Sequence, residues 1–412
     1  MQIMSNLRVK QTIYTEEDWI ADLIKSAGND RSVNSVKVSL KTFDIFCKTQ
    51  GMTRDEMAQE YRELLKPTKD EKGDYIEPDT RTVCLSLNKF VTFMCEDHDE
   101  IITSVHPMTN YVRTFKAKAP KTVKQYFGFV KTYLRRCQNV RISLENVRDY
   151  IIFPKIRKVT RQPILLSQLK EIMTYASPQR RALYYVLVSS GMRLGEGLTL
   201  TRSNFHFEEN PCRIEIEADN TKTLEDRETY ISSEAVEQMK HILGDVFYHK
   251  QDCDCQGCLK EIFAMTESQG ISVTYEDQVF GELRKKIGGI LGQKKAEGKF
   301  AGEGFFKKYK DSVRFVVNIH SMRAYFITKA SMKHGETYSH ALSGHGAYLK
   351  EYNRLTVEEK AKKYLELEPD LFIQSVKTET EKINIQEVNS LKDSMKQLQD
   401  EVDRLKKYPQ TA

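Results

Sequence analysis

The chain has 412 residues, of which 40% are hydrophobic and 30% are charged, and its formal net charge at pH 7 is +6. This length suffices for two ordinary domains with hydrophobic cores. No apolar run approaches the length of a membrane-spanning helix and residues 1–10 lack the apolar core of a signal peptide, so we expect a cytoplasmic protein and exclude a membrane protein.

The first 150 residues predict a helical domain. Apolar residues recur at helical spacing, Thr53 with Glu56 forms a capping box, and Gly51 ends the segment before it. Residues 66–79 are polar, contain two prolines and predict a loop. The predicted helices are Glu16–Lys25, a segment that includes Val36–Cys47, Thr53–Leu65, Val83–Met94 and Thr122–Arg136.

The last of these helices has a basic face. Its apolar residues, among them Val123 and Val130, lie on one side, and its cations lie on the other. Such a face is either an ordinary solvated surface or a surface that neutralises a phosphate backbone. The cations are Lys121, Lys124, Lys131, Arg135 and Arg136.

Residues 151–163 are basic and extended, with a proline near each end, and predict a linker between two domains. A positively charged linker suits two domains that close around a duplex. The alternative is an ordinary linker whose charge is incidental.

Two helices, Leu166–Ala176 and Gln179–Ser189, are predicted to open the second half. Gly191 ends the second of them and places Arg193 at the start of the next helix, where main-chain N–H groups also favour an anion. An ion pair with Glu196 is the alternative role for Arg193.

A short β-hairpin is predicted next. Residues 213–217 alternate apolar and polar side chains and can pair with residues 228–232, which places Lys222 near the turn. A hairpin lysine is usually solvated, so only the neighbouring motifs single out this one.

Residues 243–310 predict an insert in the same region. One imidazole and three thiols there are separated by three, one and two residues, which suits a tetrahedral zinc site. Only one Cys-x-x-Cys pair is present, so a polar, cysteine-rich loop is the alternative. Three glycines within residues 288–292 lack the following Lys-Ser/Thr of a phosphate-binding loop and predict flexibility. The candidate zinc ligands are His249, Cys253, Cys255 and Cys258.

Residues suited to phosphate chemistry recur late in the chain. His320 and Arg323 are three residues apart and share a helical face, where an imidazole and a guanidinium suit a common anion. Gly344 and His345 follow, and Tyr352 supplies an oxygen nucleophile.

Taken in order, these motifs resemble the pattern of the tyrosine recombinase (phage-integrase) family: Arg with Glu three residues on, a hairpin Lys, His-x-x-Arg, Gly-His and a late Tyr. The resemblance covers roughly residues 160–373, and the N-terminal half more loosely. It implies a mostly α-helical, α+β fold with a small β-hairpin or sheet in the catalytic domain. The implied parts are a helical core-binding domain (1–150), the linker (151–163), the catalytic domain (164–375) with its insert (243–310), and a C-terminal heptad helix (376–412).

The resemblance also implies an enzyme, a site-specific recombinase or integrase. It would cleave and rejoin DNA through a covalent 3′-phosphotyrosine, without ATP, metal or another cofactor in the chemistry. Arg193 and Arg323 would clamp the phosphate, and Lys222 would protonate the leaving 5′ oxygen. His320 and His345 would bind the phosphate or move a proton, and Tyr352 would be the nucleophile.

The nucleophile has two rivals, because the interval from His345 to Tyr352 is shorter than the commonest family spacing. Tyr348 lies one helical turn past His345. Tyr364 follows a charged run that resembles the tail of archaeal integrases, and the resemblance therefore extends to integrases of archaeal or archaeal-virus type.

The resemblance implies double-stranded DNA as the partner, a dimer or tetramer on that DNA, and association with the nucleoid. Alternatives are a type IB topoisomerase of the same fold, which works as a monomer, and a DNA-binding protein whose catalytic site has decayed. Apolar residues from Val388 to Leu405 follow a heptad pattern, and predict a coiled coil between protomers or a helix packed on its own domain.

Overall fold

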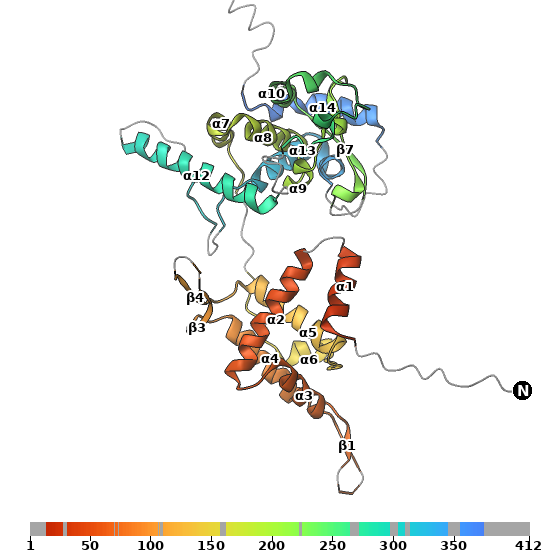
Figure 1. The fold of residues 1–412 in the computed structure, drawn as a ribbon, viewed down its shortest axis with the longest axis vertical. Helices are drawn as coiled ribbons and strands as arrows, with labels where there is room; N and C mark the ends of the chain where they lie inside the picture. The colour runs from red at the N-terminus through yellow and green to blue at the C-terminus, as the bar shows by residue number, and fades with distance from the viewer. Residues whose placement is uncertain are drawn as a thin grey trace, which may run out of the picture. The chain divides into compact units, whose positions relative to one another are not determined.

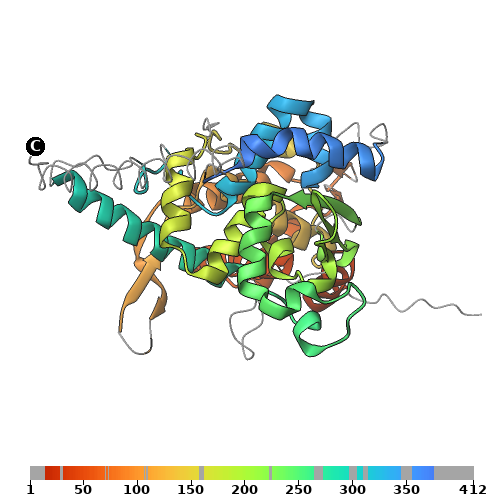
Figure 2. The ribbon, with the colours of Figure 1, turned by 90° about the horizontal axis from the view of Figure 1, so that it is seen from above.

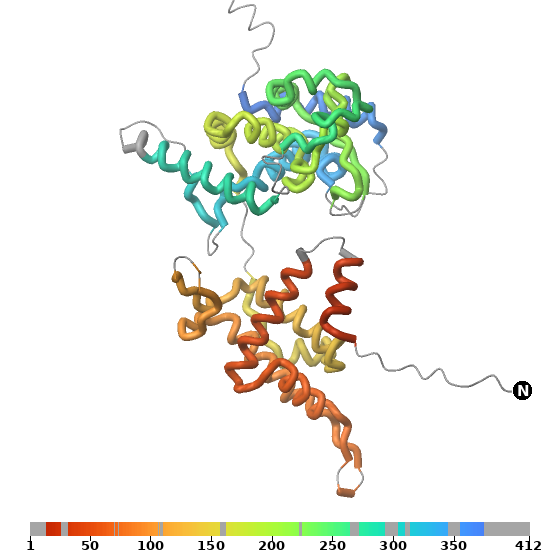
Figure 3. The backbone as a smooth tube through the Cα atoms, viewed as in Figure 1, coloured from red at the N-terminus to blue at the C-terminus, as the bar shows by residue number. Residues whose placement is uncertain are grey.

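In a computed structural model of the chain, the described residues form two compact units that divide between Lys158 and Val159 (Figures 1 and 3). This division lies within residues 151–163. Several predicted features fall outside the described residues: Lys222, His345, Tyr348, Tyr352 and the heptad helix after Gln374. The described residues are 14–27, 31–69, 71–72, 74–105, 107, 110–156, 162–221, 225–263, 272–296, 304–309, 314–344 and 355–374.

The first unit is built mainly from helices, and the five predicted helices are present with ends shifted by a few residues. The capping box of Thr53 and Glu56 begins α3 as predicted. A sixth helix, α6, was missed because it has seven residues and buries none of them, so that no apolar period marks it. The helices are α1 (Glu16–Ala27), α2 (Arg31–Thr49), α3 (Arg54–Leu64), α4 (Thr80–Met94), α5 (Pro120–Arg136) and α6 (Leu144–Tyr150).

The same unit contains two β-hairpins that the sequence did not predict. One pairs β1 (Thr68–Lys69) with β2 (Tyr75–Ile76), inside the predicted loop, and the other pairs β3 (His98–Val105) with β4 (Val112–Phe115). These two hairpins add to the β structure predicted for the catalytic domain, and the chain remains mostly helical with small sheets, as predicted. The side chains of both hairpins are mostly exposed, so the apolar alternation that identifies a half-buried strand is absent.

Helix α5 packs against α2 with its apolar face inward, where Val123 and Val130 are fully buried. Four of the five predicted cations of its other face are exposed, and Lys131 is half-buried. The predicted amphipathic arrangement is therefore present.

The second unit is mostly helical around a three-stranded antiparallel sheet of order β5-β6-β7, which confirms the predicted fold class for this half of the chain. Its elements are α7 (Leu166–Tyr175), α8 (Pro178–Ser190), α9 (Leu194–Leu198), η1 (Arg202–Asn204), β5 (Phe205–His206), β6 (Cys212–Ile216), η2 (Ala218–Asn220), β7 (Arg227–Ile231), α10 (Ser233–Leu243), η3 (Gly244–Tyr248), α11 (Gln256–Leu259), α12 (Val273–Ala296), α13 (His320–Ser343) and α14 (Val357–Leu371).

Helix α8 is the centre of this unit. Every residue from Ala182 to Ser190 is buried, and α8 packs against α10, α13, α14 and β7. Figure 2 shows the helices of this unit, coloured from yellow through green to blue, from a second direction. A helix that is apolar all round is stable only when neighbours cover it on every side. The apolar run that precedes Gly191 therefore encodes a central helix and not a surface one.

Helix α12 is joined to the core and not appended to it. Phe280, Ile287 and Leu291 belong to the hydrophobic core, although the sequence predicted an insert here. The prediction of flexibility at residues 288–292 is wrong, because the segment is regular helix. A side chain at Gly288 would overlap the ring of Phe306, so this glycine permits close packing.

A buried ion pair ties α12 to α8 and gives the first testable prediction. The guanidinium Nε of Arg180 donates to both carboxylate oxygens of Glu276 (3.1 and 3.2 Å), and the Tyr184 hydroxyl donates to the same group (2.9 Å). Glu276→Ala should lower the free energy of unfolding by about 3 kcal/mol in chemical denaturation, since the guanidinium of Arg180, which is 15% exposed, loses its partner. Glu282→Ala is the matched control on the same helix, because its pair with Lys285 is exposed. Equal effects of the two substitutions would contradict the assignment.

Candidate active site

The site is built around the end of α13. Gly344 ends the helix with a left-handed backbone (φ 67°), and a side chain there would overlap Arg227. The backbone is also non-helical at Gly335 (φ 85°, ψ 166°), so that α13 consists of two helical segments. The second segment delivers its last carbonyl groups to one place.

Three arginines from different elements bind these carbonyl groups. Arg227, at the start of β7, donates to Leu342 O (2.7 Å), and Arg323 of α13 donates to Ser343 O (2.5 Å). Arg193 donates through Nη2 to Gly344 O (2.9 Å). The last carbonyl groups of a helix lack partners within the helix and carry partial negative charge, so cations stabilise this end.

A single buried carboxylate organises two of the arginines. Glu196 accepts from the Arg193 main-chain N–H and from its Nη1, both at 2.7 Å, and forms an ion pair with Arg227. The ion pair considered as an alternative role for Arg193 is therefore present. The ion pair with Glu196 uses only one of the terminal guanidinium nitrogens of Arg193, and the other, Nη2, donates to Gly344 O at the end of α13.

Arg323 is fixed from a third side. Its Nη1 also donates to Gly191 O (2.6 Å), in the turn that ends α8. Gly191 has a left-handed backbone (φ 66°), and a side chain there would overlap the ring of Phe326. The glycine that the sequence identified as a helix terminator therefore also presents a carbonyl group to Arg323.

The cluster has more positive than negative charge. Among the residues that the structure describes, three guanidinium groups face one carboxylate, and Glu196 and Arg323 are each only 2% exposed. Burial, and then the charge of Arg193, lower the pKa of Arg323 to about 10, and burial lowers the pKa of Arg227 despite the nearby Glu196. Both groups stay charged at neutral pH. Since partly desolvated cations without enough counter-charge are costly, this arrangement favours an added anion.

The other predicted site residues flank this cluster in the chain. His320, in the first turn of α13, is exposed, whereas Arg323 one turn later is buried. Lys222 comes five residues before Arg227, so the Cα atoms of the two residues are at most about 18 Å apart. His345 directly follows Gly344. Tyr352 comes eight residues after Gly344, a reach of about 28 Å at most.

Tyr364 is a core residue in this fold, and its surroundings oppose a role as nucleophile. Its side chain is fully buried in α14, and its hydroxyl donates to Ser189 O at 2.7 Å. Its ring packs on Tyr230, with 5.4 Å between the centroids. Burial raises the pKa of its hydroxyl well above the ordinary value, which opposes formation of the nucleophilic phenolate.

Sequence reasoning missed Arg227. Its only local signal is a cation directly before the predicted strand at residues 228–232, a position that usually indicates a solvated side chain. Contact with Glu196, 31 residues away, and Leu342, 115 residues away, reveals its position in the site.

The predicted zinc ligands also come together. His249, Cys253, Cys255 and Cys258 place one ligand atom each within 4.8 Å of one another. The segment around η3 and α11 forms this cluster. It is a different part of the chain from those that supply Arg193, Arg227 and Arg323.

Residues 164–297 match the model of the phage integrase family. The chain therefore carries a domain of that family, the tyrosine recombinases, and the resemblance drawn from the sequence is confirmed for this region. The matched region includes Arg193 and ends before His320.

The tyrosine recombinase XerC of Chlamydia pneumoniae is similar to 42% of this chain, with 24% identity over 177 residues. The match covers 54% of XerC, so the chain spans about half the length of this curated relative. Among solved structures, the Tn1549 transposon integrase in complex with transposon right end DNA matches 84% of this chain and 97% of its own, at 13% identity and a TM-score of 0.43. A lambda integrase dimer bound to a COC′ core site matches 84% of this chain and 85% of its own, at 13% identity and a TM-score of 0.39.

Among the described residues, no helix is both long enough and apolar enough to cross a bilayer.

Proposed function

We propose that this protein is a site-specific DNA recombinase that cleaves and rejoins strands through a tyrosine. The observation that carries the proposal is the convergence of Arg193, Arg227 and Arg323 on one helix end with a single carboxylate among them. Such an excess of preorganised donors suits a phosphodiester, whose negative charge grows on the nonbridging oxygens during displacement. The phage integrase match over residues 164–297 supports the same conclusion.

In the proposed reaction, the hydroxyl oxygen of Tyr352 attacks phosphorus and the bond to the 5′ oxygen breaks. The product is a 3′-phosphotyrosine and a free 5′ hydroxyl. Lys222 gives its proton to the leaving oxygen, while His345 or His320 accepts the tyrosine proton or binds the phosphate. One phosphoester bond replaces another, so the reverse attack by a 5′ hydroxyl needs no ATP. A hydroxyl from a second duplex gives recombination.

The arginines have separate tasks in this proposal. Arg193 and Arg323 hold the phosphate, and their bonds to Gly344 and Ser343 also hold the start of the segment that leads to Tyr352. Arg227 positions Glu196 and Leu342 and does not itself need to reach DNA. The guanidinium groups thus couple phosphate binding to the placement of the nucleophile segment.

Duplex DNA is the proposed partner of the first unit as well. The cations exposed on α5 are all on the side opposite its buried Val123 and Val130, as expected for a helix that follows a phosphate backbone. No metal or other cofactor takes part in the proposed steps.

A covalent-trapping experiment tests the proposed function. The protein is incubated with duplexes that carry a nick near the scissile phosphate, so that a short fragment diffuses away after cleavage and prevents religation. Denaturing electrophoresis should then show a protein–DNA adduct, and peptide mapping should locate the modified tyrosine. If the protein binds duplexes of an attachment-site library but forms an adduct with none of them, the result would support the alternative of a DNA-binding protein whose catalytic site has decayed. Adduct formation with relaxation of supercoils, but without exchange between two sites, would support a type IB topoisomerase.

The C-terminal heptad segment gives a prediction about assembly. We infer that residues after Gln374 contact a neighbouring protomer on DNA, since a stripe of under three heptads does not hold a helix in isolation. A chain truncated after Gln374 should cleave a single site at the full rate but lose most cooperative binding and exchange between two sites, measured by gel shift and product analysis. Loss of single-site binding would instead place the segment in its own domain, and exchange at the full rate would show that it has another role.

A further inference from the structure

Three thiols surround one imidazole nitrogen at the beginning of the predicted insert. The His249 Nδ1 atom lies 3.3 Å from Cys258 Sγ, 3.4 Å from Cys255 Sγ and 3.6 Å from Cys253 Sγ. All eight cysteines of the chain are free thiols in the structure.

These separations fit a tetrahedron of zinc ligands. Bonds of about 2.0–2.1 Å to nitrogen and about 2.3 Å to sulfur imply a nitrogen–sulfur separation of about 3.5 Å between two ligands. The three separations at His249 lie within a few tenths of an ångström of this value. One imidazole and three thiolates are a common ligand set for structural zinc, and sulfur ligands disfavour magnesium and calcium.

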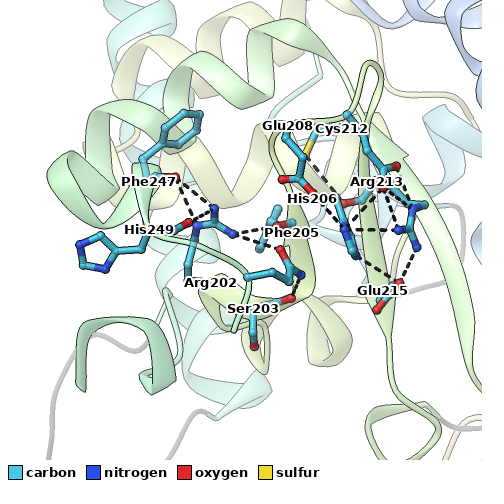
Figure 4. Close-up of polar contacts among 12 residues, drawn as sticks. Arg202, Ser203, Phe205, His206, Glu208, Cys212, Arg213, Glu215, Phe247 and His249 are labelled. Carbon is cyan, nitrogen blue, oxygen red and sulfur yellow. Dashed lines mark hydrogen bonds and ion pairs between the residues drawn. The ribbon is translucent and has the colours of Figure 1, made fainter. Parts of the chain in front are cut away.

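A buried arginine holds the main chain at His249 and at Phe247, two residues before it (Figure 4). Arg202 donates to Phe247 O (3.2 and 3.3 Å), to His249 O (2.6 Å) and, on its other side, to Phe205 O (2.8 Å). Gln251 donates to Ser203 O. These bonds join residues 247–251, and with them His249, to η1 and β5.

The segment itself has almost no hydrophobic support. Within residues 244–262, all of which the structure describes, Cys258 is the one side chain classed as buried. Apart from Phe247, whose ring packs on Phe207 with 4.4 Å between centroids, and Ile262, which packs against the core, the stretch gains little from apolar burial. Short segments of this kind are commonly held by a metal or by disulfides. An added metal would supply this missing constraint.

We propose that His249, Cys253, Cys255 and Cys258 bind one structural zinc ion, which holds the η3–α11 segment against η1 and β5. A disulfide is a poorer solution, because joining two of the three thiols leaves the third beside the imidazole without a partner. Nearby His206, Glu208 and Glu209 also cluster, but Arg213 already neutralises Glu209 (2.8 Å), so that group needs no cation (Figure 4).

Metal analysis of the full-length protein tests the proposal. Protein purified without chelator, from medium supplemented with zinc and under reducing conditions, should contain about one zinc per chain, since four ligands complete one tetrahedron. Cys258→Ser and Cys253→Ser should each reduce the zinc content at least about fivefold, because three ligands bind zinc more weakly. Cys95→Ser is the matched control, an exposed thiol in the first unit, and should retain full zinc.

A protease experiment tests the structural role and does not depend on the variants folding. Zinc is extracted from the wild-type protein with a mercurial and a chelator, and trypsin is then added before and after zinc is restored. Cleavage after the exposed Lys250 and Lys260 should be fast without zinc and at least about tenfold slower with it, as local unfolding is suppressed. Three results would overturn the proposal. The protein could contain no zinc and take none up, it could contain iron instead, or trypsin could cleave it equally fast with and without zinc. None of these outcomes bears on the tyrosine chemistry.

Discussion

Tyr352→Phe is expected to abolish the covalent protein–DNA adduct and to leave duplex binding nearly unchanged. The substitution removes one hydroxyl oxygen, the atom that attacks phosphorus in the proposed reaction, and retains the ring. Loss of a nucleophile lowers the rate of the chemical step by roughly 10⁴-fold or more, so no adduct should be visible on the nicked duplex. Binding depends on cations elsewhere, and a gel shift should give the same affinity as the wild type.

Two other tyrosines serve as comparisons for this experiment. Tyr364→Phe should keep full adduct formation and lower stability by about 1 kcal/mol, because it removes one buried hydrogen bond, to Ser189 O. Tyr348→Phe should also keep the adduct. If Tyr352→Phe forms adduct and Tyr348→Phe does not, the nucleophile is Tyr348.

Arg323→Lys is expected to lower the rate of cleavage by about 10²- to 10³-fold, the cost of removing one preorganised donor to a developing oxyanion. The lysine keeps the charge but loses the planar guanidinium whose Nη1 reaches Gly191 O and Ser343 O and which, in the proposed reaction, binds the phosphate. Single-turnover rates on the nicked duplex measure the effect, and the DNA affinity should change little.

Arg213→Lys provides the matched control for this change. Arg213 also lies in the second unit and pairs with Glu209 and Glu215, but it makes no bond to the carbonyl groups at the end of α13. The Arg213→Lys variant should cleave at close to the wild-type rate. If Arg323→Lys also cleaves at that rate, the proposed phosphate clamp is wrong. If it only unfolds at lower temperature, with an unchanged rate below that temperature, Arg323 has a purely structural role.

Much of the local structure followed from the sequence. Capping residues and apolar spacing act over three or four residues, so Thr53 with Glu56, Gly191 and the buried face of α5 could be identified without coordinates. The four candidate zinc ligands were identified for the same reason, since they lie within ten residues of one another in the chain. The polar motifs were identified by their order along the chain, through resemblance to a family and not through geometry.

The tertiary structure decided what those residues contact. Gly344 O meets Arg193 across 151 residues, and Tyr364 reaches Ser189 O across 175, separations that no spacing rule encodes. For that reason the sequence left Tyr364 as a rival candidate for the nucleophile, whereas the fold places it in the core. For the same reason the sequence did not single out Arg227. A local pattern specifies which face of an element is apolar. Only packing between distant elements determines which carbonyl, carboxylate or hydroxyl a guanidinium will meet, because that contact depends on the path of the whole chain between them.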